Sequence, residues 1–92
     1  MPTLYSFGKC RLFFWSNESG EPVHVHVAMG SPSPNTTKIW LTKASGCVVA
    51  NNRSRIPDRE LNQALKFITT EHAVICELWK KYFGTDDIKF YC

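Results

Sequence analysis

Two histidines two residues apart carry the most distinctive chemistry in the sequence. His24 and His26 lie in the strictly alternating run 23–27, and side chains two apart on a strand point the same way. Two such imidazoles can act as general base and general acid across a phosphodiester, with Arg11 or Lys38 stabilising the charged transition state. The pair can instead supply two metal ligands, or form hydrogen bonds within an interface. The three alternatives stay open on spacing alone.

The metal alternative needs a third protein ligand for a catalytic zinc. Cys47, Glu21 and His72 are candidates, but none has a spacing typical of such a site. No two cysteines form a CxxC pair, and the chain shows no export signal, so we expect free thiols at Cys10, Cys47, Cys76 and Cys92. We therefore predict neither a metal nor another cofactor.

The strands that position the histidines have two faces of contrasting composition. One set of alternating residues is wholly apolar and should form the core: Leu12, Phe14, Val23, Val25, Val27, Ile39 and Leu41. The other set is aromatic and cationic: Arg11, Phe13, Trp15, His24, His26, Lys38 and Trp40. Surfaces that bind single-stranded nucleic acid have this composition, with rings beneath bases and cations at phosphates. The alternative is that the C-terminal tail or a second copy of the chain covers this face.

Strands are expected in the first half of the chain and helix in the second. Residues 11–15 and 23–27 should form a hairpin around a turn at 16–20, followed by a strand at 38–42 and a weaker one at 47–50. Helix is predicted by a stripe at three- and four-residue steps, which comprises Leu61, Leu65, Ile68, His72, Ile75, Trp79 and Tyr82. The fold class is therefore α+β, an antiparallel sheet of three to four strands packed on one long C-terminal helix.

The ends of this helix and the residues along it carry further expectations. Pro57 suits its first turn, Gly84 its C-terminal stop, and the β-branched pair at 69–70 a bend. His72 and Trp79 face the core, so we expect a partly buried, hydrogen-bonded histidine and a core tryptophan. Arg53 and Arg55 precede the helix, as a solvated loop or a patch for phosphate or an acidic partner. The tail 88–91 adds a strand or packs on the sheet.

Length and composition limit the classes of protein to consider. The chain has 92 residues, which suits a single domain over 1–92. Its 13% aromatic content excludes disorder, and no apolar run is long enough to span a membrane. The first residues lack the features of a secretion signal, so we expect a cytoplasmic protein. A net charge of +3 is too small to indicate nucleic-acid binding by itself.

Several short motifs resemble a bacterial domain-of-unknown-function family, number 4160, over residues 1–84. The motifs that carry the resemblance are the opening Met1-Pro2-Thr3, the aromatic run 11–16, the segment 21–27 with its HxH pair, the run 38–41, and the helix segments 60–61, 77–79 and 82–84. The sequence departs from the family pattern in three places. Val23 replaces the second proline of PPH, the loop 29–37 is longer, and residues 85–92 run past the usual end.

The resemblance implies a setting for the protein and no defined reaction. Members of the family lie beside another small domain in compact two-gene units, and some are regarded as toxin–antitoxin components. It therefore implies a toxin–antitoxin-type component whose aromatic, cationic face meets a cognate small protein, RNA, or both in turn. Two other functions fit the same residues: a metal-independent ribonuclease using His24 and His26, and a structural homodimer with this face as the self-interface.

Overall fold

The computed structural model describes residues 3–15, 20–30 and 36–92. Met1 and Pro2 of the family motifs lie outside these residues, as do most of the turn predicted at 16–20 and most of the loop predicted at 29–37.

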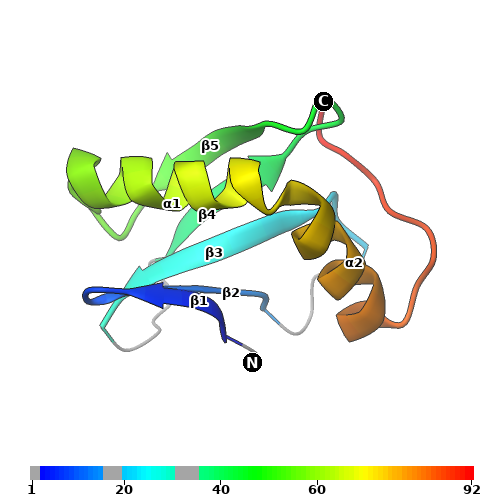
Figure 1. Ribbon diagram of the computed structural model, residues 1–92, viewed down its shortest axis with the longest axis horizontal. Helices are drawn as coiled ribbons and strands as arrows, with labels where there is room; N and C mark the ends of the chain where they lie inside the picture. Colours follow the sequence, from blue (N-terminus) through cyan, green and yellow to red (C-terminus); the bar gives the residue numbers. More distant parts are fainter. Residues whose placement is uncertain (1–2, 16–19, 31–35) are drawn as a thin grey trace.

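The described residues form one antiparallel sheet of five strands in the order β1-β2-β3-β4-β5 (Figure 1). The strands are β1 Thr3–Phe7, β2 Cys10–Phe13, β3 His24–Met29, β4 Thr37–Leu41 and β5 Cys47–Asn52. The predicted hairpin is confirmed, because β2 pairs antiparallel with β3. The expected strands at 38–42 and 47–50 correspond to β4 and β5. The expectation of three to four strands was wrong, because β1 had not been predicted.

β1 lacks the regular alternation that marks β3 and β4. Its register against β2 shifts between Thr3 and Tyr5, so apolar and polar residues no longer alternate along it. The sequence signal for this hairpin is instead the short turn at Gly8-Lys9. Gly8 has a φ of 55° there, a conformation that glycine adopts without a steric penalty.

The second half of the chain forms two helices, α1 Asp58–Thr70 and α2 His72–Phe83, which corrects the expectation of one long helix. The helical path is interrupted at Glu71, with φ −104° and ψ 23°, directly after the pair of threonines where a bend was predicted. The backbone hydrogen bond from Glu71 N to Phe67 O, 2.9 Å long, persists through the bend. α2 ends at Gly84, as predicted, in the left-handed conformation with a φ of 63°.

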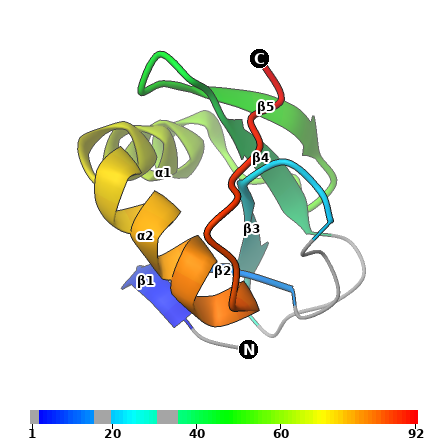
Figure 2. The same ribbon diagram turned by 90° about the vertical axis from the view of Figure 1, so that its right-hand side faces the viewer.

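Both helices cover one face of the sheet, and the core lies between this face and the helices (Figure 2). All seven residues of the predicted apolar face are at most 1% exposed. The helices add Ala64, Ile68, Ile75 and Trp79, each also at most 1% exposed. The predicted core face of the sheet and the core position of Trp79 are therefore confirmed. Within the described residues, neither helix has the length and apolar character needed to cross a membrane.

Residues 85–92 run across one end of the sheet without forming a strand (Figure 2). Two backbone hydrogen bonds hold this tail, from Val23 N to Lys89 O at 2.8 Å and from Lys43 N to Cys92 O at 2.9 Å. Ile88 and Phe90 pack, partly buried, against the core. The tail therefore packs on the sheet, which is one of the two predicted alternatives.

Candidate functional site

The histidine pair lies at the centre of the sheet, between the neighbouring strands β2 and β4. His26 is opposite Phe13 on β2 and opposite Lys38 on β4. His24 is opposite Trp40 on β4. The two imidazole centroids are 5.0 Å apart and their planes are inclined by 78°. The register therefore brings together the two histidines, Phe13, Lys38 and Trp40 on one face, as the alternation predicted.

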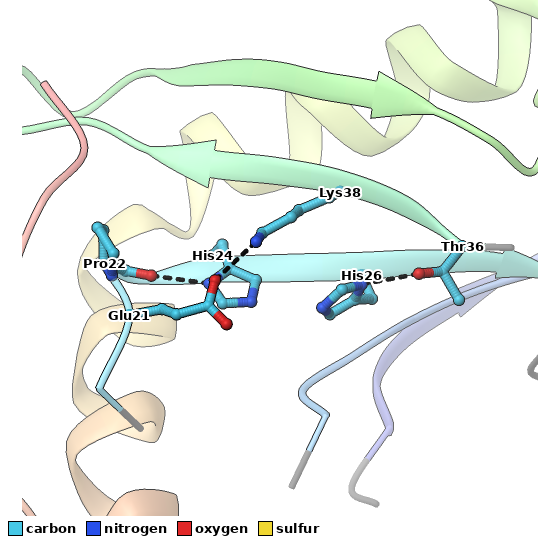
Figure 3. A network of polar contacts seen from close by, with 6 residues as sticks. All are labelled: Glu21, Pro22, His24, His26, Thr36 and Lys38. Atoms are coloured by element: carbon cyan, nitrogen blue, oxygen red, sulfur yellow. Dashed lines mark hydrogen bonds and ion pairs between the residues drawn. The ribbon is translucent and has the colours of Figure 1, made fainter. Parts of the chain in front are cut away.

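Each histidine ring is oriented by a hydrogen bond at Nδ1 (Figure 3). The Nδ1 of His24 lies 2.7 Å from the carbonyl oxygen of Pro22. Because a carbonyl oxygen can only accept, Nδ1 of His24 carries the hydrogen, and Nε2 is the basic nitrogen of the neutral ring. The Nδ1 of His26 lies 2.8 Å from Oγ1 of Thr36, and this hydroxyl can donate or accept. No pattern in the sequence predicted Thr36 or the Pro22 carbonyl as partners of the pair.

Lys38 places a positive charge beside the histidines. Its Nζ lies 2.7 Å from Oε1 of Glu21 and 4.2 Å from the centroid of the Trp40 ring. The side chains of Lys38 and Glu21 are 20% and 40% exposed, so solvent screens this ion pair only in part. The indole and the carboxylate together hold the ammonium group in place on this face.

The histidine face is more enclosed than an open stacking surface would be. Phe13, His24 and His26 are 1%, 1% and 5% exposed. Trp15 packs edge-on against Phe13 and His26, with centroid distances of 5.2 and 5.9 Å. Trp79 of α2 also packs against His24, with ring centroids 5.3 Å apart. The accessible part of the face is therefore formed by half-buried side chains around the histidines.

The C-terminal tail covers one of these side chains. The ring of Tyr91 stacks on the ring of Trp40, with centroids 5.0 Å apart and planes inclined by 4°. Tyr91 itself is 59% exposed. The alternative in which the tail covers this face therefore holds at Trp40. We use "HxH surface" below for Arg11, Trp15, His24, His26, Lys38 and Trp40.

The arginines named from the sequence lie at the margin of this surface or beyond it. Arg11 is opposite Ala28, one step along the face from His26, and its Nη2 lies 3.5 Å from the Gly30 carbonyl oxygen. Lys38 is thus the cation directly opposite the pair. Arg53 and Arg55 are exposed between β5 and α1.

None of the proposed third metal ligands joins the histidine pair. The carboxylate of Glu21 pairs with Lys38, and the sulfur of Cys47 lies 3.7 Å from Oγ1 of Thr69 on α1. Across residues 3–15, 20–30 and 36–92, no three His, Cys, Asp or Glu side chains are grouped so that they could hold a metal ion.

His72 has the structural role that was predicted for it. It is 9% exposed, and its Nε2–H donates to the carbonyl oxygen of Thr42 at 2.7 Å. Its other nitrogen, Nδ1, lies 3.8 Å from the sulfur of Cys76. The ring also stacks on Phe90 of the tail, with centroids 6.0 Å apart. His72 therefore links α2 to the β4–β5 connection and to the tail.

Comparison with protein families gives one match. The family model described as "Domain of unknown function (DUF4160)" matches residues 10–80, which is more than half of the chain and includes the whole histidine pair. No curated protein and no solved structure matches the chain. The matched region contains β2 to β5, α1 and most of α2, whereas the tail that stacks on Trp40 lies beyond it.

Proposed function

The chain belongs to the DUF4160 family, and we propose that it is a cytoplasmic toxin–antitoxin-type component that binds its partner through the HxH surface. The toxin–antitoxin role rests on the resemblance described above, and the partner class is a cognate small protein or RNA. The HxH surface favours RNA of these two, because its accessible groups are cations and rings. The proposal for the surface does not depend on the toxin–antitoxin role.

The observation that carries this proposal is the position of Lys38. Its ammonium group lies over Trp40 and is directly opposite His26 in the register. On binding RNA, the ammonium group of Lys38 would leave its ion pair with Glu21 and form a charge-assisted hydrogen bond to a phosphate. Half-buried Trp15 and Arg11 flank the same surface, and can contact a base and a second phosphate.

A fluorescence titration with single-stranded RNA tests RNA binding at this surface. We expect quenching of Trp15 and Trp40 emission that weakens as salt increases, because phosphate contacts release counterions. Lys38→Met should weaken binding and lower the slope of log K against log salt by about 1. Lys66→Met is the matched control, because Lys66 is an exposed lysine on α1, over the opposite face of the sheet. An equal effect of both substitutions, or no quenching at low salt, would contradict the proposal.

A metal-independent ribonuclease is the second candidate, and the orientation of His24 favours it. Its hydrogen bond to the Pro22 carbonyl oxygen fixes Nδ1 as the donor nitrogen, and the centroid of its ring lies 5.0 Å from the centroid of the His26 ring. In such a reaction one neutral histidine would take the proton of the ribose 2′-hydroxyl as that oxygen attacks phosphorus. The other, protonated, would donate its proton to the departing 5′-oxygen, and Lys38 would stabilise the developing negative charge.

Cleavage assays separate this candidate from simple binding. A ribonuclease of this kind should show a bell-shaped pH–rate profile and keep its activity in a chelator. Loss of activity in the chelator would instead favour the metal alternative. Intact RNA that is nevertheless bound would limit the function to binding.

Expression in bacteria tests the toxin–antitoxin role. We expect growth inhibition by the natural sequence and its loss in the double variant His24→Ala, His26→Ala, with the fold verified by circular dichroism and melting. A double variant that stays fully toxic would remove the pair from the mechanism. The homodimer alternative predicts a melting temperature that rises with protein concentration and ceases to do so in Trp15→Ala.

A further inference from the structure

A second surface, on α2, exposes apolar side chains that the histidine chemistry does not use. Val74, Leu78 and Tyr82 recur every four residues and are 52%, 38% and 36% exposed. Val74 and Leu78 face away from the core, to which the same helix contributes Ile75 and Trp79. Tyr82, which belongs to the stripe that predicted the helix, is only partly covered, and its ring packs on core residue Phe14 with centroids 5.7 Å apart. α2 is therefore apolar on two sides, whereas a surface helix needs only one apolar side to pack against its own sheet.

The exposed side of α2 is hollowed. Two shallow depressions of about 370 and 250 Å³ lie along it, and Leu78 and Lys81 line both. Val74 and Glu77 line the first, and the second extends over Tyr82 to Leu4 at the edge of the sheet. We call Leu4, Val74, Glu77, Leu78, Lys81 and Tyr82 the α2 groove. β1, which carries Leu4, is an edge strand of the sheet and lies beside α2 (Figure 2).

The charges that border the groove are arranged in a self-complementary way. Glu77 and Lys81 are one helical turn apart, on the same flank of the row formed by Leu78 and Tyr82. The side chain of Glu77 is 74% exposed and its contact with Lys80 is a long one, 3.4 Å. A two-fold axis perpendicular to α2, passing between these two positions, keeps the flank and reverses the helix direction. Such an axis brings Glu77 of each copy to Lys81 of the other.

We propose that the α2 groove is a homodimer interface, in which α2 packs antiparallel on the α2 of a second copy of this chain. Leu78 and Tyr82 of the two copies interdigitate at the centre, where apolar area is removed from water. Two symmetric Glu77–Lys81 pairs fix the antiparallel register at the rim. A second copy is the occupant favoured by charge, because one flank carries both signs one turn apart. A partner of one charge would leave one of the two groups unmatched.

This interface is separate from the HxH surface, and its proposal stands without the RNA proposal. The dimer is measured as a mass in the absence of RNA, whereas RNA binding is measured by fluorescence with variants of the sheet. Failure of either one leaves the result of the other unchanged. The two interfaces also differ from the self-association through Trp15 considered above.

Sedimentation velocity over a range of protein concentrations tests the dimer. The samples contain a reducing agent, because Cys92 is an exposed free thiol that could link copies by a disulfide. We expect a monomer–dimer equilibrium, and Leu78→Asp should raise its dissociation constant by about tenfold or more. Val48→Asp is the matched control, because Val48 is 41% exposed but lies on β5. It should leave the constant unchanged.

Charge reversal tests the register of the dimer. Glu77→Lys places two lysines opposite each other at both ends, and Lys81→Glu places two glutamates there, so each variant alone should dimerise about fivefold more weakly. An equimolar mixture of the two variants should restore dimerisation, because each copy then supplies the charges that the other lacks. If each substitution weakened dimerisation only by disturbing α2 of its own chain, mixing the two variants would not restore dimerisation.

Three results would overturn the proposal. The first is a monomer at every concentration, including the highest at which the protein stays in solution. The second is a dimer that Leu78→Asp leaves intact, which would place the interface elsewhere. The third is a mixture of the two charge variants that dimerises as weakly as either variant alone, which would reject the antiparallel register.

Discussion

Tyr91 and Trp40 stack with their ring planes nearly parallel, at 4°, although they come from the end of the chain and from the middle of the sheet. Lys38 Nζ also lies near the Trp40 ring, 4.2 Å from its centroid. Trp40 is thus contacted by a tail residue and by a cation of the HxH surface. The family match covers residues 10–80, so Trp40 lies within the matched region and Tyr91 lies outside it.

Removing the Tyr91 ring should expose Trp40 to water. Tyr91→Ala is expected to shift the Trp40 emission to longer wavelength and to lower the free energy of unfolding by about 1 kcal/mol, the value typical of an aromatic pair. The shift is assigned to Trp40 by repeating the measurement in a Trp40→Phe background. Tyr82→Ala, which removes a similarly large exposed ring from α2, serves as control. An unchanged spectrum would show that the tail does not cover Trp40 in solution.

The hydrogen bond of His72 should contribute to stability and not to binding. His72→Phe keeps a ring beside Phe90 but leaves the Thr42 carbonyl oxygen without its donor, which costs about 1–3 kcal/mol. Denaturant unfolding measures this loss, and His72→Gln should lose less because it retains an N–H donor. RNA affinity of both variants should equal that of the natural sequence. A weaker RNA affinity in His72→Phe would show that His72 contributes to RNA binding.

Replacing Gly84, which ends α2, should strain the backbone. Its φ of 63° is unfavourable for a residue with a Cβ atom, so Gly84→Ala should lower the free energy of unfolding by about 1 kcal/mol. Gly20→Ala is the matched control, because an added Cβ meets nothing within 4 Å there and no positive φ is needed. Thermal melting of the two variants should differ accordingly, with equal melting temperatures contradicting the assignment.

The four thiols should differ in their rates of alkylation. Burial raises the pKa of the Cys10 thiol above its ordinary value, and the negative charge of Glu60 raises it further. Burial also raises the pKa of Cys76, whereas Cys92 is exposed. Since the thiolate is the reactive form, we expect Cys92 to react with iodoacetamide first and Cys10 last near neutral pH. Mass spectrometry of peptides gives the order, and denaturant should remove the difference between Cys10 and Cys92.

Much of the fold follows from period-two alternation where the alternation is unbroken. The run 23–27 has valines on one side and histidines on the other, and this was sufficient to predict the core face. The pattern fails in β1, where the register shift between Thr3 and Tyr5 hides the strand. The helical pattern of three- and four-residue steps fails in a different way at Glu71. The apolar stripe continues through the bend there, so the sequence predicts one helix where the structure has two.

The residues of the site could be predicted better than their environment. The shared face of His24 and His26 follows from the two-residue spacing alone. Their burial does not, because it comes from residues distant in the sequence: Trp79 of α2 lies against His24. The partners of Nδ1 are a backbone carbonyl and a hydroxyl group, whose positions depend on how the chain enters β3 and β4. Side-chain alternation carries no information about either.

The order of the sheet has a consequence for how the molecule assembles. Every pair of neighbouring strands is also consecutive in the chain, so each pairing closes only a short loop and the sheet can grow hairpin by hairpin. The contact of Val23 with Lys89 is different, because both helices separate the two residues in the chain. We expect the tail to dock last during folding and to open first in the native state, with the earliest amide hydrogen exchange at Val23 and Lys43. Spontaneous opening of the molecule then begins beside Trp40.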